Sequence, residues 1–198
     1  MKKYELTDEY IEIGFVTKIK LYRIKALVTI ASIGVSAGDL GGYIEKEVNL
    51  DQSGDAWVSG NAWVYGNAEV SGNAKVYGNA WVLGDAKVYG NAKVYGNAKV
   101  YGNAKVYGNA KVYGNAKVCG NAEVSERSDI VWFSNVGTEY GTLTVFKTKQ
   151  GVLWATIGCF SGSVEEFLKK SAEVHDEKTK REYQLLIEVA KSRLEETQ

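Results

Sequence analysis

The sequence predicts an all-β solenoid, a parallel β-helix of hexapeptide repeats, with a non-repeating cap at each end. Residues 54–125 repeat one six-residue unit twelve times, Gly-Asn-Ala-Lys-Val-Tyr and close variants. Gly, Ala and Val keep their positions in every copy, and the second position is always Asn or Asp. A period of six, with a small and an aliphatic residue two apart, is typical of a parallel β-helix.

Each copy of the repeat is expected to form a short strand followed by a corner. Ala and Val are two residues apart, so both point inward, and the residue between them points outward. Gly-Asn supplies the corner, because both residues tolerate a positive φ. Three sides give a coil of 18 residues, and the 72 repeat residues give four coils. A helix would instead contain Gly throughout, at a cost of about 1 kcal/mol each.

Residues 18 apart then stack about 4.8 Å from each other, which defines three faces of the coil. The first face carries Trp57, Lys75, Lys93 and Lys111 beside Ser59, Tyr77, Tyr95 and Tyr113. The second face carries Trp63, Trp81, Lys99 and Lys117 beside Tyr65, Leu83, Tyr101 and Cys119. The third face carries Glu69, Lys87, Lys105 and Glu123 beside Ser71, Tyr89, Tyr107 and Ser125. The second face is the least polar, and it predicts an oligomer contact through Trp63, Tyr65, Trp81, Leu83 and Tyr101.

Composition predicts a folded cytoplasmic protein. The chain has 24 basic and 24 acidic residues, so bulk charge does not select a polyanion. Only two cysteines are present, which is too few for a disulfide framework and favours a reducing compartment. The N-terminus lacks the apolar run of a signal peptide, and no segment is apolar enough for a membrane span.

The chain divides into an N-terminal cap (1–53), the repeats (54–136) and a C-terminal cap (137–198). Alternating apolar residues within 3–30 predict β-structure that covers the open end of the coil, and 38–50 predict its first rung. The phase of the repeat continues to Val136. Residues 140–157 predict two strands joined by a turn near 149–151. Ser163 and Glu166 form a capping box that begins a helix ending near His175, and a second helix is expected over 177–195.

The repeat resembles that of the hexapeptide acyltransferases, but the chemistry of that superfamily is missing. Those enzymes use a His base on or near the coil, whereas the one His here, His175, lies in the predicted helical cap. We therefore expect no enzymatic activity. His175 is interpreted as a helix-end residue, and Cys119 with Cys159 does not make a metal site. Lys and Tyr recur at the outward positions of the repeat. We interpret them as ordinary outward residues of a sheet rather than as a nucleic-acid binding site. No cofactor is expected.

A closer resemblance lies outside the repeats. The stretches Asp39-Leu-Gly-Gly-Tyr-Ile-Glu, Trp132-Phe-Ser-Asn-Val-Gly-Thr-Glu-Tyr-Gly, Gly158-Cys-Phe-Ser-Gly and Arg181-Glu-Tyr are similar to a family of uncharacterised hexapeptide-repeat proteins of phages and prophages. This resemblance covers nearly the whole chain and implies a left-handed β-helix that associates as a trimer or dimer. It implies the host cytoplasm for a phage-encoded protein, and it carries over no catalytic residue.

Our functional hypothesis is a non-enzymatic binding protein that sequesters a signalling nucleotide of host defence or blocks a defence protein. The ligand is expected where the coil meets the C-terminal cap, because basic and aromatic residues there flank Ser-rich turns. The candidate site comprises Arg127, Trp132, Ser134, Asn135, Ser161, Ser163 and Arg181. Two alternatives stay open: a scaffold oligomer without a small ligand, and an acyl-coenzyme A-dependent transferase.

Overall fold

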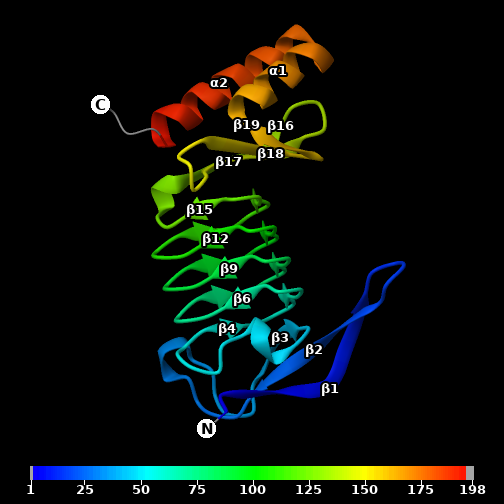
Figure 1. Cartoon of the computed structure of the whole chain (residues 1–198), viewed down its shortest axis with the longest axis vertical. Coiled ribbons are helices and arrows are strands. Elements are labelled where there is room, and N and C mark those ends of the chain that lie inside the picture. The colour runs from blue at the N-terminus through cyan, green and yellow to red at the C-terminus, as the bar shows by residue number, and fades with distance from the viewer. Residues whose placement is uncertain (1, 195–198) are drawn as a thin grey trace.

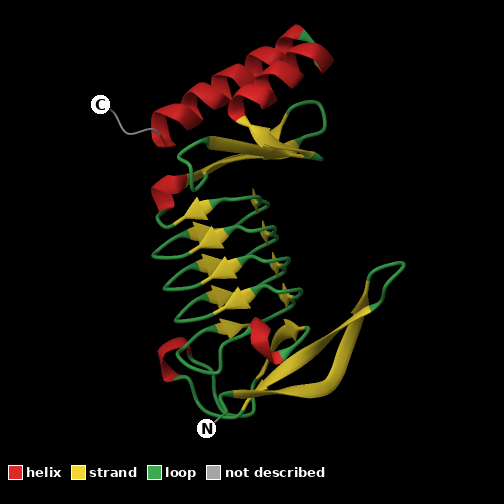
Figure 2. Cartoon of the chain, in the orientation of Figure 1, coloured by secondary structure: helices red, strands yellow, loops and turns green. Residues whose placement is uncertain are grey.

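A computed structural model describes residues 2–194 as one elongated body (Figure 1). A parallel β-solenoid forms the middle, a β-hairpin projects from its N-terminal end, and a small sheet with two helices closes its C-terminal end. Figure 2 shows the same order by element type, with strands through the coil and the two long helices stacked beyond the last sheet. The predicted fold class is confirmed.

Three stacks of two-residue strands form the coil. The first face contains β4 (Trp57–Val58), β7 (Lys75–Val76), β10 (Lys93–Val94) and β13 (Lys111–Val112). The second face contains β5 (Trp63–Val64), β8 (Trp81–Val82), β11 (Lys99–Val100) and β14 (Lys117–Val118). The third face contains β6 (Glu69–Val70), β9 (Lys87–Val88), β12 (Lys105–Val106) and β15 (Glu123–Val124). Lys93 pairs in parallel with both Lys75 and Lys111, which confirms the 18-residue coil.

The repeat satisfies its own backbone and fills its own core. Every Ala and Val of the repeat is at most 1% exposed, because the two methyl-bearing positions of each side point to the axis. Backbone groups bond to the next rung, as in the 3.0 Å bond from Tyr77 N to Val94 O. The corner glycines have positive φ, and a Cβ on Gly84 would lie 3.2 Å from the backbone nitrogen of Gly102. Close stacking therefore requires Gly at these corners.

The N-terminal segment extends the second face instead of lying flat over the coil. β1 (Tyr4–Ile13) pairs antiparallel with β2 (Ile19–Ala26), and β2 pairs antiparallel with β3 (Leu40–Ile44). β3 pairs in parallel with β5, so all of these strands belong to one seven-stranded sheet. The β1–β2 hairpin, residues 4–26, is called the arm below. Only its base covers the end of the coil.

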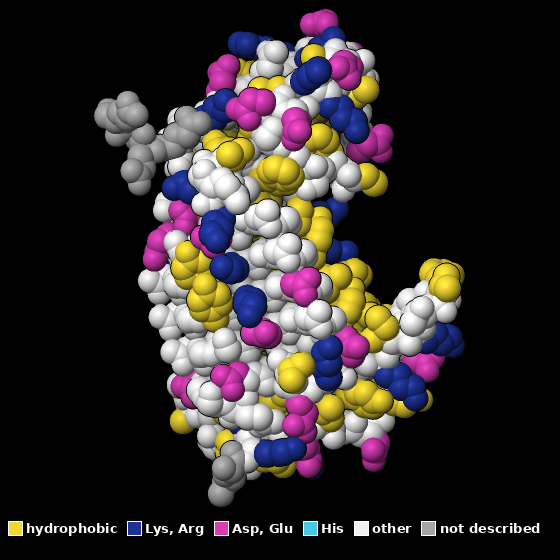
Figure 3. Space-filling model, in the orientation of Figure 1, with side chains coloured by type: hydrophobic (Ala, Val, Ile, Leu, Met, Phe, Trp, Pro, Cys, Tyr) yellow, Lys and Arg dark blue, Asp and Glu magenta, His cyan; other side chains and the backbone are white. Residues whose placement is uncertain are grey.

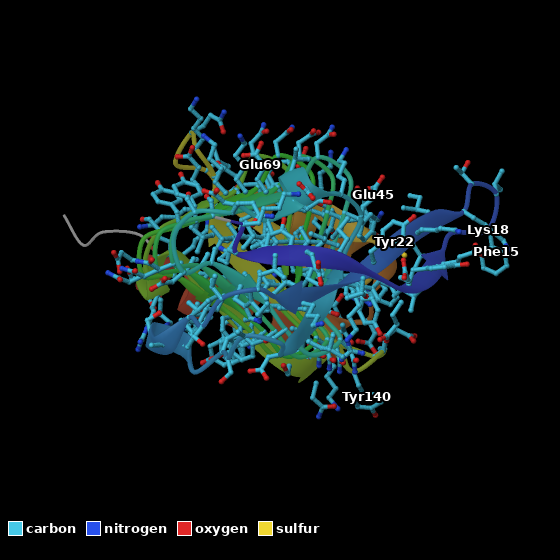
Figure 4. All side chains as sticks on the ribbon, turned by 90° about the horizontal axis from the view of Figure 1, so that it is seen from below. Phe15, Lys18, Tyr22, Glu45, Glu69 and Tyr140 are labelled. Carbon is cyan, nitrogen blue, oxygen red and sulfur yellow. The ribbon has the colours of Figure 1, made fainter. Side chains whose placement is uncertain are left out.

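Figure 4 views the molecule from below and shows how far the arm reaches. Phe15 and Lys18 lie at its tip, well outside the outline of the coil, and Tyr22 lies nearer to the coil. Phe15 and Val16 in the turn are fully exposed. At the base, the carboxylate of Glu9 accepts bonds from Arg23 Nη1 and from the hydroxyl of Tyr43, both at 3.0 Å. These bonds tie the arm to β3.

Polar side chains close the lower end of the coil. Lys3 Nζ donates to the carbonyl of Ala56 at 2.8 Å, and the Tyr4 hydroxyl donates to the carbonyl of Leu50 at 2.7 Å. Asn49, in the 3₁₀ turn η2 (Glu47–Asn49), donates to the carbonyl of Ala68 at 2.8 Å. Trp57 pairs with Lys75 in the predicted register, but the residue is only 4% exposed, because Tyr4 packs edge-on against its ring.

The C-terminal cap begins earlier than expected. After the 3₁₀ turn η3 (Arg127–Asp129), strand β16 (Ile130–Val136) leaves the coil and pairs antiparallel with β17 (Gly141–Lys147). The expectation that the coil continues to Val136 is therefore wrong after Ile130, whose side chain still reaches the coil core. β18 (Leu153–Ile157) makes the predicted hairpin with β17, and β19 (Phe160–Ser163) adds a fourth strand.

Two helices cover the outer side of this sheet. α1 (Val164–Val174) begins at the predicted capping box, in which Ser163 and Glu166 exchange bonds of 3.2 and 2.8 Å. α2 (Glu177–Leu194) packs on the sheet through one apolar face, with Tyr183, Ile187, Ala190 and Leu194 buried. Neither helix is long and apolar enough to cross a membrane, as far as the described residues extend.

Candidate functional site

A cavity of about 450 Å³ lies where the first face of the coil meets the cap. The last two rungs supply Tyr95, Lys111 and Tyr113, η3 supplies Arg127, and β16 supplies Trp132. Arg193, in the last turn of α2, completes the wall. We call this the junction cavity. Its volume lies within the range of small-molecule sites in proteins.

Three cations gather in the junction cavity: Lys111, Arg127 and Arg193. Within residues 2–194, none of them takes part in an ion pair. The positive charge of Arg127 lowers the pKa of Lys111, and Lys93 one rung below adds to this effect. Since like charges raise each other's free energy, an anion placed between them would be stabilised.

An aromatic wall adjoins these cations. Tyr77, Tyr95 and Tyr113 stack along the first face with centroid separations of 4.8 and 4.9 Å. Trp132 ends the ladder, with its ring edge-on to Tyr113 at 4.4 Å and 88°. The backbone of the coil imposes this spacing, because each Tyr follows the inward Val of its rung. A planar ligand could stack on the indole of Trp132, which is only partly buried, as bases do on aromatic platforms.

The structure brings together only part of the predicted ligand site. Arg127 and Trp132 line the junction cavity. Ser134 and Asn135 lie toward the other end of β16, where Asn135 has a φ of 64° and the register shifts. Ser134 is 3.4 Å from the hydroxyl of Thr142 on β17. These two polar residues therefore belong to the far edge of the sheet.

The two predicted serines have structural partners. Ser161 accepts a bond from Trp154 Nε1 at 2.9 Å and lies 3.2 Å from Cys119 Sγ, which joins the cap to the second face. Ser163 caps α1, and its backbone nitrogen donates to the carboxylate of Glu166. The start of α1 thus already holds a carboxylate of its own, that of Glu166.

Arg181, the predicted arginine of α2, does not line the junction cavity. It is exposed in the first half of the helix, twelve residues and about 18 Å before Arg193. The last turn of α2 lies beside η3, where Arg193 and Leu194 line a small cavity together with Arg127. The sequence shows that Arg193 directly precedes an apolar residue, Leu194, which is buried in the structure. This neighbour did not reveal which end of α2 lies beside the coil.

The predicted oligomer face forms one continuous surface. Trp63 and Trp81 stack at 4.7 Å and 7°, and Lys99 Nζ lies 3.6 Å above the ring of Trp81. Tyr65, Leu83 and Tyr101 are half-buried in the same sheet. Figure 3 shows hydrophobic side chains gathered in the hollow between the arm and the cap. That this surface joins copies of the chain stays a prediction.

The described lining of the junction cavity offers cations and aromatic rings. Within residues 2–194, it includes neither a carboxylate nor a histidine. His175 ends α1 and packs on Tyr183 in the cap, as a helix-end residue. Within the described residues, no cluster of three or more His, Cys, Asp or Glu side chains is arranged to hold a metal ion. The arrangement is suited to holding an anion beside a ring.

The chain matches no model of a known protein family, and no curated protein is significantly similar to it. The resemblance to phage hexapeptide-repeat proteins therefore stays a prediction from the residues.

Proposed function

We propose that the protein is a non-enzymatic binding protein whose junction cavity holds an anionic ligand with an aromatic ring, such as a nucleotide. The observation that carries the proposal is that Lys111, Arg127 and Arg193 share one cavity with the Tyr113–Trp132 wall. Arginine forks bind phosphate oxygens in bidentate fashion. A stacked base adds about 1–3 kcal/mol.

We further propose that the ligand is a signalling nucleotide of host defence, which the protein would sequester. This choice is supported by the resemblance to phage-encoded proteins alone. A defence protein is the alternative partner. The binding site and the biological source of the ligand are separate proposals, so they need separate tests.

Calorimetric titration with ADP, ADP-ribose, cyclic nucleotides and acyl-coenzyme A tests the site. We expect a nucleotide to bind, and Arg127→Ala or Arg193→Ala to weaken it about tenfold or more, since hydrogen bonds to charged groups are worth about 1.5–3 kcal/mol. Arg181→Ala is the matched control, because it removes an exposed arginine of the same helix outside the cavity. Adenosine should bind more weakly than ADP, because it lacks the phosphates.

Two results would contradict the proposal. If none of the nucleotides bound, the proposed ligand class would be wrong. If Arg127→Ala and Arg181→Ala weakened nucleotide binding equally, the proposed site would be wrong. Binding of acyl-coenzyme A with turnover would instead support the acyltransferase alternative.

We also propose that the second face joins copies of the chain into a dimer or trimer. The stacked pair Trp63–Trp81 on the second face favours this scaffold function. Sedimentation of the Trp63→Ser/Trp81→Ser variant should show dissociation to the monomer. A wild-type chain that already sediments as a monomer at high concentration would contradict it.

A further inference from the structure

A second, smaller cavity lies inside the C-terminal cap, away from the coil. Its volume is about 200 Å³, and it lies between the sheet, α1, α2 and the turn at residues 137–141. We call it the cap cavity. It shares no lining residue with the junction cavity, so the function proposed above leaves it unexplained.

Aromatic rings form most of one wall of the cap cavity. Phe160 and Phe167 lie 5.4 Å apart between centroids, Phe167 and Tyr183 5.0 Å, and Tyr183 and His175 5.5 Å. Val136 and Ile157 supply aliphatic surface. Such a wall favours a flat apolar ligand, because rings gain from edge-to-face and offset contacts with other rings.

One polar atom in the cavity lacks a partner. Ser171 of α1 is only 3% exposed, and its hydroxyl makes no hydrogen bond within the described residues. Ser171 also lines the cap cavity. An unpaired buried hydroxyl is destabilising, and a native protein usually pairs it. A ligand with one hydrogen-bonding group would provide that partner.

The charges at the rim do not select a charged ligand. Lys170 and Glu139 both line the cavity, and both are exposed. Their charges are opposite, so the electrostatic potentials of the two side chains offset each other at the mouth. Lys170 Nζ also lies over the Phe160 ring, 5.7 Å from its centroid. A neutral ligand is therefore favoured over an anion or a cation.

We propose that the cap cavity binds a neutral single-ring aromatic molecule with one hydroxyl group, a phenol, whose hydroxyl pairs with Ser171. The volume agrees with this class, since an apolar protein cavity of about 150 Å³ holds benzene. The ring lies against Phe160, Phe167 and Tyr183. This site is independent of the nucleotide proposed for the junction cavity.

Phenol and toluene are the matched probes, because they differ by a hydroxyl in place of a methyl group. Titrations followed by NMR should place phenol shifts on Ile157 and Phe160. Ser171→Ala should weaken phenol about two- to tenfold, the value of one neutral hydrogen bond, and leave toluene unchanged. Ser192→Ala is the control, since Ser192 is exposed on α2 outside the cavity. Arg127→Ala should leave phenol binding unchanged.

The stability of the unliganded variant gives a second readout. Ser171→Ala should melt at or above the wild-type temperature, because it removes an unpaired buried hydroxyl. Gly141→Val should block phenol, because a Cβ on Gly141 meets Ile157 at an ordinary 3.5 Å and the branched side chain then extends beside the cavity. Absence of phenol binding, equal effects of Ser171→Ala on both probes, a lower melting temperature for Ser171→Ala, or phenol shifts that persist in Gly141→Val would each overturn the proposal.

Discussion

The coil and its two ends solve the same physical problem in different ways. Inside the coil each rung bonds to the next, and Ala with Val fills the axis, so no other residue type is needed. At the ends the next rung is missing. There Lys3 and Asn49 below, and Thr144 and Thr156 above, bond to the backbone that the last rung leaves free.

This difference determines where chemistry is found. Inside the coil the backbone and the inward Ala and Val are the same at every level, and most outward positions carry Lys or Tyr, so neighbouring levels differ little. Both cavities proposed as sites lie near or beyond the last rungs, and both are lined by non-repeating residues: Arg127 and Trp132 in the junction cavity, and Ser171 in the cap cavity. The following tests weaken the coil and its ends separately, from the largest expected effect to the smallest.

The largest effect is expected for Val94→Asp in the middle of the coil. Val94 is fully buried among methyl groups, and a carboxylate there has no partner. We expect a loss of about 3–5 kcal/mol or complete unfolding. Circular dichroism with urea titration measures this. Lys93→Asp, the adjacent outward position, is the control, and equal losses in the two variants would contradict the inward assignment.

A smaller effect is expected for Lys3→Met at the lower end. The change keeps most of the side-chain stem but removes bonds to the carbonyls of Ala56, Ser53 and Gly54. We expect a loss of about 1.5–3 kcal/mol, as for hydrogen bonds to a charged group. Lys2→Met is the control, because Lys2 makes an exposed pair with Glu47. Equal urea midpoints for the two variants would show that the end needs no such closure.

Two glycine corners separate backbone strain from stacking. Gly84 and Gly120 both have positive φ, +72° and +64°. A Cβ on Gly84 would meet the next rung, whereas a Cβ on Gly120 would meet nothing within 4 Å. Gly120→Ala should therefore cost about 1–2 kcal/mol, and Gly84→Ala more. Equal losses in thermal unfolding would mean that the rungs separate at no cost.

The smallest effect is expected from acid at the upper end. Burial opposes ionisation of Asp129, but hydrogen bonds from Ser125, Glu126 and Lys147 outweigh it and hold its pKa below the usual range. The pKa is depressed on folding, so the resulting stability is present above about pH 4 and is lost as pH falls through the folded value. The gap in urea midpoint between wild type and Asp129→Asn should narrow from pH 7 to pH 3. A gap that widens would contradict this.

Sequence periodicity predicted what local rules determine. The inward Ala and Val, the 18-residue register and the Ser163 capping box follow from spacing and from bonds over three or four residues. The failures involve contacts between distant segments. The choice of Arg181 over Arg193 depended on the direction of α2 across the sheet, and burial of Trp57 depended on Tyr4, 53 residues earlier.

The residue at which the coil ends could not be predicted from local sequence patterns either. Ser134 and Val136 keep the spacing of the repeat. Strand β16 nevertheless pairs antiparallel with β17, which follows it directly in the chain, and so it leaves the coil. The cap cavity has no local pattern either, since Ser171 gains its meaning only from the strands beneath α1. Sequence thus predicted two residues that line the junction cavity, Arg127 and Trp132, but it did not predict Lys111 or Arg193.

Because each turn of the coil takes 18 residues, the number of repeats sets both the distance and the angle between the arm and the cap. Three added hexapeptides would lengthen it by one rung, about 4.8 Å, and would return the cap to its original orientation. One added hexapeptide would instead turn the cap by a third of a revolution about the axis. The hollow above the second face would then open toward a different side from the arm. Length and angular phase are thus set by the same count of repeats.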